Sequence, residues 1–171
     1  TASLRILADW VIDNFYPDCR DDAQPYAALL AQVTLRTADL IARWQGVGFC
    51  HGVLNSDNMS ILGLTLDYGP FGFQDGFNAA HICNHSDHTG RYAWHMQPEI
   101  GLWNLHCLAQ ALLPLADKEV LTDVLKQYQP QFESAFSEQL RLKLGLHAWQ
   151  DEDWDLVSKL LELMQQSSTD W

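Results

Sequence analysis

The sequence predicts a mainly α-helical fold with one small β-hairpin, and three observations lead to this prediction. Outside residues 47–96, apolar residues recur every three to four positions, which is the spacing of helices with one buried face. Residues 59–66 instead form two short apolar runs separated by Gly63, the pattern of two strands joined by a turn. With 171 residues, of which 47% are hydrophobic, the chain has the size and composition of one folded domain.

Two helices are expected before the hairpin. An apolar stripe over residues 4–15 is ended by Pro17, and a longer stripe over residues 26–44 is stopped by Gly46 and Gly48. The second helix would lead the chain directly into the polar segment that follows it.

Four more helices are expected over residues 98–168. A proline suited to a first helical turn, or an aspartate suited to an N-cap, marks each start: Pro98, Asp117, Pro130, and Asp151 or Asp153. Between the hairpin and these helices, residues 70–97 show no sustained period and are expected to form a long loop.

The candidate chemistry lies in residues 51–58, His-Gly-Val-Leu-Asn-Ser-Asp-Asn, and in the Asp-Tyr-Gly that begins at Asp67. A hairpin over residues 59–66 would bring Asp57 and Asn58 to the same end as Asp67. Two carboxylates and an amide oxygen are hard ligands, the set that Mg²⁺ requires when it binds nucleotide phosphates. We therefore predict that these three side chains form a metal and nucleotide site.

The order of these features is that of the phosphotransferase fold. In that fold a histidine-led catalytic loop ends in a metal-binding Asn, and a hairpin then leads to a metal-binding Asp before an aromatic residue and a glycine. Kinases of this fold place their base five residues before the metal Asn. Here that position holds Val53, which cannot accept a proton, and Asp57 is the only carboxylate in the loop. The sequence therefore predicts the C-terminal lobe of a protein-kinase-like fold, either inactive or with a different chemistry.

This displaced acid, with the run from His51 to Phe73, resembles the selenoprotein O (YdiU) family. Members of that family are kinase-like proteins that transfer AMP, not phosphate, from ATP to protein hydroxyls. The resemblance continues through residues 81–92, His-Ile-Cys-Asn-His-Ser-Asp-His-Thr-Gly-Arg-Tyr, and residues 97–105, Gln-Pro-Glu-Ile-Gly-Leu-Trp-Asn-Leu. A run of more than twenty residues is far more specific than a short motif.

By position, the resemblance implies Asp57 as the proton acceptor. It implies Asn58 and Asp67 as ligands of Mg²⁺ or Mn²⁺, with Asp67 also at the nucleotide. ATP and proteins with Ser, Thr or Tyr hydroxyls are the implied partners, so the expected function is a protein adenylyltransferase. We expect His51 to be architectural, with a hydrogen bond to the backbone near Asp67, rather than a proton shuttle.

The lysines indicate that part of the enzyme lies elsewhere, because all four follow the candidate loop: Lys118, Lys126, Lys143 and Lys159. A kinase-like enzyme needs an upstream lysine, and usually a Gly-rich loop, to hold the phosphates. We therefore expect a single-domain fragment over residues 1–171 without its N-terminal lobe, inactive by itself. It would comprise the catalytic loop and hairpin (51–69), an activation-type segment (70–97) and the helices (98–168).

Two other functions remain open at this point. The chain is either a kinase with a relocated base or a non-catalytic helical scaffold. Transfer of label from α-labelled rather than γ-labelled ATP separates adenylyl transfer from kinase activity. A scaffold would show no metal-dependent nucleotide binding, even in a full-length protein.

The segment after the hairpin carries further metal-binding and thiol side chains. His81, Cys83, His85 and His88 are ligand types for zinc, and the three histidines would share a face of a helix, but their spacing matches no common zinc pattern. Cys83 is either a partly buried ordinary thiol or a redox handle. The resemblance favours the second interpretation and implies a redox partner for Cys83 outside this chain.

Charge and cysteine content limit the partners and the compartment. A net charge of −12 argues against nucleic acid and anionic membranes as partners, since both require clustered Lys or Arg. Four widely spaced cysteines suit a reducing compartment better than a disulfide framework. We expect a cytoplasmic protein if the source is bacterial, with the mitochondrion as the alternative for a eukaryotic relative.

Overall fold

A computed structural model describes residues 2–171. These residues form six helices, a two-stranded antiparallel sheet and three 3₁₀ turns in this order: α1 (Ala2–Phe15), η1 (Pro17–Cys19), α2 (Pro25–Gly46), β1 (Phe49–Cys50), η2 (Ser56–Asn58), β2 (Gly72–Phe73), η3 (Trp94–Met96), α3 (Gln97–Leu112), α4 (Lys118–Leu125), α5 (Tyr128–Leu144) and α6 (Asp153–Ser167). The prediction of a mainly α-helical chain is therefore confirmed, and the described residues contain one small antiparallel sheet in place of the predicted hairpin. Among the described residues, no helix combines the length and apolarity needed to cross a membrane.

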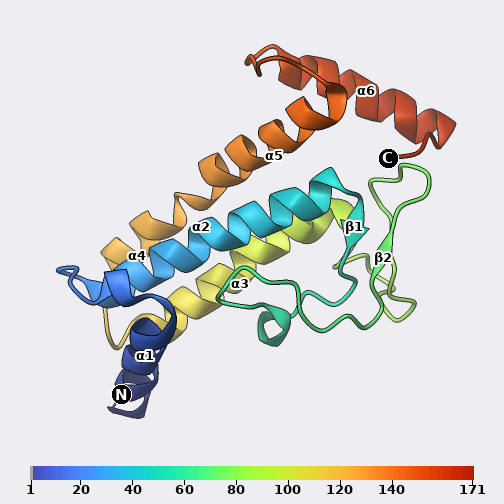
Figure 1. The fold of residues 1–171 in the computed structure, drawn as a ribbon. Helices are drawn as coiled ribbons and strands as arrows, with labels where there is room; N and C mark the ends of the chain where they lie inside the picture. Colours follow the sequence, from blue (N-terminus) through green and yellow to red (C-terminus); the bar gives the residue numbers. More distant parts are fainter. Residues whose placement is uncertain (1) are drawn as a thin grey trace.

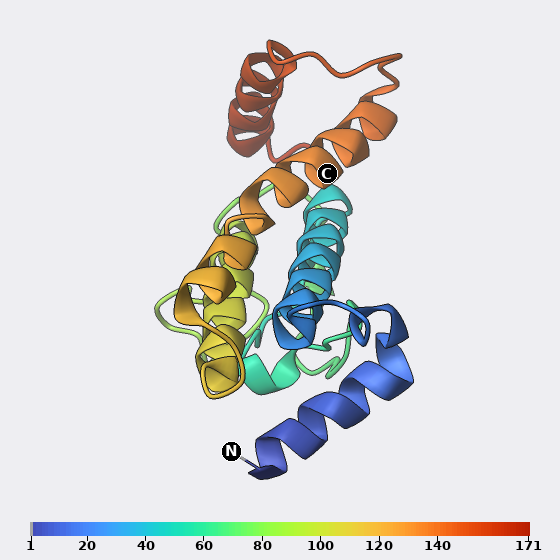
Figure 2. The same ribbon diagram turned by 90° about the vertical axis from the view of Figure 1, so that its left-hand side faces the viewer.

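Helix α2 is the central element of the fold. It packs against α3, α4 and α5, while α1 extends from one end of the helices and α6 lies near the other (Figures 1 and 2). Its apolar stripe places Leu30, Ala38 and Ile41 fully inside the core. Where α2 meets α3, a Cβ added to Gly101 would lie 2.2 Å from Ile41 Cδ1, so this glycine allows the two helices to approach closely.

The prediction of a hairpin over residues 59–66 is wrong. The backbone there forms hydrogen bonds with side chains and within a local turn, and it does not pair with a second strand. The Ser60 hydroxyl accepts a hydrogen bond from the Leu62 N–H (3.1 Å), and the Tyr16 hydroxyl donates to the Ile61 carbonyl. Gly63 closes the turn with a left-handed φ of +68°. The short apolar runs misled the prediction because Ile61 and Leu62 pack on the helical core.

The two strands of the observed sheet flank the candidate segment in the sequence. Strand β1 precedes His51, strand β2 follows Pro70, and Phe49 pairs with Phe73 in antiparallel register. Pairing these two strands brings together the two ends of the chain segment that carries Asp57 and Asp67. Figure 1 shows the segment as irregular chain leaving and returning at this small sheet.

The last residues of the chain contact the end of α2 and the segment that follows β2 (Figure 1). The Trp171 indole N–H donates to the Gln45 carbonyl at the end of α2 (2.9 Å), and the Phe77 N–H donates to the Thr169 carbonyl (2.7 Å). The Trp171 ring packs on Phe77, with 5.1 Å between ring centroids. The predicted loop over residues 70–97 is thus held in place by contacts with distant parts of the chain.

Candidate active site

His51 joins the two segments that carry the candidate residues. Its side chain is 1% exposed, and its Nε2 lies 2.9 Å from the Leu66 carbonyl oxygen, directly before Asp67. A carbonyl only accepts, so Nε2 carries the hydrogen, and Nδ1 accepts from the Val53 N–H at 3.4 Å. The prediction that His51 bonds to the backbone beside Asp67 is confirmed.

Gly52 provides a second contact between the same two segments. Its φ of +82° lies in the left-handed region that glycine favours. A Cβ at this position would lie 2.5 Å from the Pro70 carbonyl oxygen, well inside van der Waals contact. The residue after His51 must therefore be glycine for the chain around Pro70 to pack so closely.

Asp57 and Asn58 lie on the 3₁₀ turn η2. The Asn58 N–H donates to the Asn55 carbonyl (3.0 Å), which closes the turn. The Asn58 side-chain amide donates to the Val53 carbonyl (3.0 Å), so Oδ1 points away from that bond and is free to accept or to bind a cation. Asp57 is exposed on the same turn.

Asp67 has an unusual backbone conformation for a residue other than glycine. Its φ is +56°, a region that Asp and Asn tolerate better than most side chains. The Gly69 N–H donates to the Asp67 carbonyl (2.8 Å), which forms a tight turn over Tyr68. The side chains of Asp57 and Asp67 are exposed, and neither forms an ion pair within residues 2–171.

Helix α3 contributes two buried polar side chains that sequence reasoning missed. Gln97 donates to the Phe49 carbonyl (2.9 Å) and accepts from the His51 N–H (2.8 Å). Asn104 donates to the Leu54 carbonyl (3.0 Å). The available signal was the presence of two amides at helical spacing on the apolar face of this helix.

The activation-type segment reaches the catalytic loop through Tyr92. The Tyr92 hydroxyl donates to Asn55 Oδ1, and Asp87 accepts from the Tyr92 N–H (2.7 Å) and the Arg91 N–H (3.0 Å). Burial alone would raise the pKa of Asp87, but these hydrogen bonds and that of Thr89 hold the pKa of Asp87 below its ordinary value. Asp87 thus organises its own turn and is not a free carboxylate.

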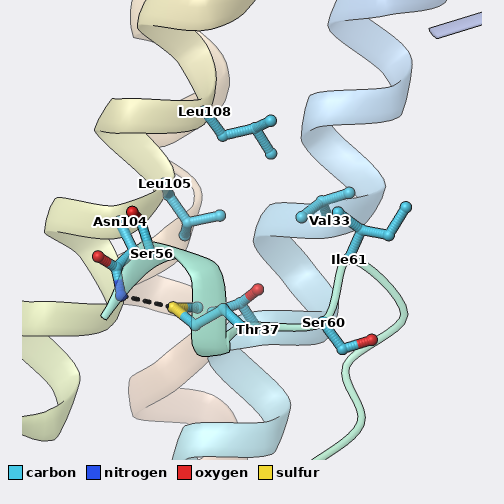
Figure 3. Close-up of a pocket in the computed structure, with 9 residues that line it drawn as sticks. Val33, Thr37, Ser56, Ser60, Ile61, Asn104, Leu105 and Leu108 are labelled. Atoms are coloured by element: carbon cyan, nitrogen blue, oxygen red, sulfur yellow. Dashed lines mark hydrogen bonds between the residues drawn. The ribbon is translucent and has the colours of Figure 1, made fainter. Parts of the chain in front are cut away.

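Beneath the loop, a small cavity lies between α2 and α3. Its volume is about 80 Å³. Figure 3 shows Val33 and Thr37 from α2 facing Leu105 from α3, with Ser56 and Ser60 from the loop at its edge. Side chains of α2, of α3 and of the segment around η2 therefore line one cavity.

The side-chain types of Asp57, Asn58 and Asp67 are those that a magnesium or manganese ion bound to phosphate would require. Asp57 and Asp67 present unpaired carboxylates, and Asn58 presents a free amide oxygen. Mg²⁺ binds through one or two carboxylates and takes its other oxygens from phosphates and water. Within residues 2–171, no group of three or more His, Cys, Asp or Glu side chains is arranged to hold a metal by itself.

The zinc alternative therefore gains no support. Residues 81–88 form turns, not a helix, so the three histidines do not share a helical face. His81 Nε2 instead lies 3.3 Å from the Cys83 sulfur, and His85 and His88 are exposed.

Cys83 lies beside the buried Cys50. The Cys83 thiol donates a hydrogen bond to the Cys50 carbonyl, with 3.7 Å between sulfur and oxygen. A hydrogen bond between the two thiols, together with burial, raises the pKa of Cys83, and the same bond lowers the pKa of Cys50. At neutral pH Cys83 is therefore a protonated and weakly nucleophilic thiol in this conformation. A redox partner for Cys83 outside this chain stays a prediction.

Comparison with known proteins identifies the family. The family model described as "Protein adenylyltransferase SelO" matches residues 1–171. The chain belongs to the SelO family. The resemblance seen in the sequence is confirmed.

Over the aligned residues, relatives in the SelO family are more than half identical to this chain. The "Protein nucleotidyltransferase YdiU" of Cupriavidus metallidurans is 54% identical over 99% of this chain and 34% of its own length. That of Burkholderia ambifaria is 55% identical over 98% of this chain and 35% of its length. That of Cupriavidus pinatubonensis is 52% identical over 99% and 36%. The chain thus spans about a third of the length of the curated relatives it matches.

Replacement of Gly52 by alanine tests the packing of the two segments. Gly52→Ala must accommodate both a left-handed backbone and the clash with the Pro70 carbonyl. Gly145→Ala is the matched control, because Gly145 has a φ of +69° and open space around its Cβ position. We expect the control to lose about 1 kcal/mol of unfolding free energy and Gly52→Ala about 2 kcal/mol more, measured by urea denaturation. Equal losses would show that Pro70 does not restrict this position.

Proposed function

We propose that this chain is the catalytic-loop part of a protein adenylyltransferase, which transfers AMP from ATP to Ser, Thr or Tyr hydroxyls of proteins. The observation that carries the proposal is the combination of unpaired Asp57, the free oxygen of Asn58 and the His51 bond to the segment of Asp67. Membership of the SelO family supports transfer of AMP in preference to phosphate. The names of its nucleotidyltransferase relatives support the same choice.

In this proposal Asp57 orients the protein hydroxyl and accepts its proton. The hydroxyl oxygen forms a bond to the α-phosphorus of ATP, the bond from that phosphorus to the bridging oxygen breaks, and pyrophosphate leaves. Asn58 and Asp67 would hold Mg²⁺ or Mn²⁺, which neutralises phosphate charge when bound. Positioning and charge neutralisation supply most of the rate in transfers of this kind.

The proposed domain is the C-terminal lobe of a kinase-like fold, with the ATP-clamping residues elsewhere in a longer protein. The order of helix, loop, Asp-aromatic-Gly and long segment supports this assignment. Two of the lysines have structural partners. Lys143 donates to the Gly46 carbonyl (3.0 Å), and Lys126 pairs with Asp123 (2.7 Å). These two are therefore not poised to hold phosphates.

The proposed partners are ATP and substrate proteins, without nucleic acid or membrane. The net charge of −12 supports both exclusions, since polyanionic partners would be repelled. Free cysteines support a reducing compartment, which we propose to be the cytoplasm of a bacterial cell.

The first functional prediction concerns the acid. We expect Asp57→Ala in the full-length enzyme to lower AMP incorporation into proteins at least ~100-fold, because no other carboxylate in the loop can replace it. Incorporation of label from α-³²P-ATP measures the transfer, and γ-³²P-ATP run in parallel detects a kinase. Asp75→Ala is the control, since Asp75 is exposed on the neighbouring segment. Normal labelling by Asp57→Ala would remove Asp57 from the mechanism.

The second concerns metal-dependent nucleotide binding. We expect Asp67→Ala to weaken Mg²⁺-ATP binding more than Asp57→Ala does, because a metal ligand holds the ground state whereas a base acts mainly in the transition state. Because Asp67 has a φ of +56°, Asp67→Asn is measured beside it to separate charge from backbone strain. Calorimetry decides, and equal affinities for the Asp57 and Asp67 variants would contradict these roles. A full-length protein with no metal-dependent ATP binding would instead indicate a scaffold.

The third concerns the 171-residue chain alone. We expect it to bind ATP weakly and to transfer no AMP, because its unpaired carboxylates and its net charge of −12 repel the nucleotide. Purified chain incubated with α-labelled ATP, Mn²⁺ and a protein acceptor checks this expectation. Robust labelling would mean that the phosphate-binding groups lie within these residues.

A further inference from the structure

Helix α3 presents two buried amide side chains to the catalytic loop. Gln97 is 1% exposed and Asn104 is 5% exposed. They are seven residues apart, which is close to two helical turns, so both lie on the same face about 10 Å apart along the axis. Burying a polar amide is unfavourable unless it is hydrogen-bonded, so the contacts of these two side chains are informative.

The side-chain amide of Gln97 bonds to β1 in the way that the backbone of a neighbouring strand would. Phe49 and Cys50 pair with β2 on one side, and on the other side the Gln97 amide bonds to the Phe49 carbonyl (2.9 Å) and to the His51 N–H (2.8 Å). A side-chain amide supplies both the donor and the acceptor that these two bonds require. The backbone of His51 is thereby fixed, and the His51 ring fixes the Leu66 carbonyl before Asp67.

Asn104 holds a different point of the loop. Its amide nitrogen donates to the Leu54 carbonyl (3.0 Å), one residue before Asn55, whose own carbonyl closes the η2 turn. The same nitrogen also donates to Met59 Sδ (2.7 Å), so its two contacts lie on either side of the η2 turn that carries Asp57.

We propose that Gln97 and Asn104 are positioning residues with separate tasks. Gln97 sets Asp67 through His51, and Asn104 sets Asp57 through Leu54. This inference rests on the proposed function for the roles of the two aspartates. One helix, α3, would thus align both Asp67 and Asp57.

The test compares Gln97→Met and Asn104→Asp in the full-length enzyme. Methionine keeps the length of Gln97 without hydrogen bonds, and aspartate keeps the shape of Asn104 but removes its donor. Gln110→Met is the matched control, because Gln110 lies exposed on the same helix. Gln97→Glu retains an acceptor for the His51 N–H, and serves as a conservative variant and as a substitute if Gln97→Met does not fold. Asn104→Ala is the substitute if Asn104→Asp does not fold.

Two kinetic outcomes are expected. Gln97→Met raises the Mn²⁺ concentration for half-maximal ATP binding about 10-fold, with a smaller change in kcat at saturating metal. Asn104→Asp lowers kcat about 10-fold at saturating Mn²⁺ and ATP. Gln97→Glu lies between Gln97→Met and wild type in metal dependence. If both variants change the two quantities in the same proportion, or if Gln97→Met behaves like Gln110→Met, the separate tasks are refuted.

Amide hydrogen exchange tests the same inference without catalysis. Gln97→Met is expected to accelerate exchange of the His51 and Gly69 amides about 10-fold, and Asn104→Asp that of the Asn58 amide. Acceleration of all three amides by either variant would show a general loosening and overturn the proposal. Because exchange does not depend on AMP transfer, it separates failure of this proposal from failure of the proposed function. The latter would show as normal labelling by Asp57→Ala.

Discussion

The hydrogen bond from His51 to the Leu66 carbonyl holds together two segments that lack regular secondary structure beyond the η2 turn. The imidazole is enclosed by the rings of Trp44 and Phe49, with centroids at 5.5 and 6.4 Å, so water cannot easily replace either partner. Removal of one partner would leave the other group buried without a hydrogen bond, at a cost of about 1–3 kcal/mol. The other contacts of the site depend on this bond, because it fixes the backbone position directly before Asp67. The bond itself depends on Gln97, which fixes the backbone of His51.

The carboxylates of the chain fall into two physical groups. Asp87 accepts hydrogen bonds from several nearby donors, and Glu138 pairs with Arg141, so the pKa of each acid is held below its ordinary value. Asp57 and Asp67 are exposed and form no ion pair with residues 2–171, in a chain whose net charge is already −12. Unpaired acids in a negatively charged molecule attract cations and repel free nucleotide. The electrostatic surroundings of these two acids therefore favour cations over free anions.

Periodicity predicted the helices well, because their apolar stripes face the core, although α5 begins at Tyr128, two residues before the predicted Pro130. It misplaced the strands, because Ile61 and Leu62 fill the edge of the helical core and only look like a strand in sequence. The pairing of Phe49 with Phe73 spans a long segment and leaves no local signature. The motif predicted Asp57, Asn58 and Asp67 as site residues from residue type and order, and these roles stay a prediction. Gln97 and Asn104 escaped notice because their importance arises from contacts with backbone carbonyls, which every residue possesses.

The attachment of the C-terminal residues to the loop also has a consequence for biosynthesis. The Phe77 N–H bonds to the Thr169 carbonyl, about ninety positions later in the chain, and Trp171 reaches back to the end of α2. At about 5–20 residues per second, these partners leave the ribosome roughly 5–20 s after the loop they order. During that interval the loop is exposed to proteases and chaperones without its final contacts. A premature stop before Thr169 would therefore leave the helices largely complete but remove the contacts that restrain the loop.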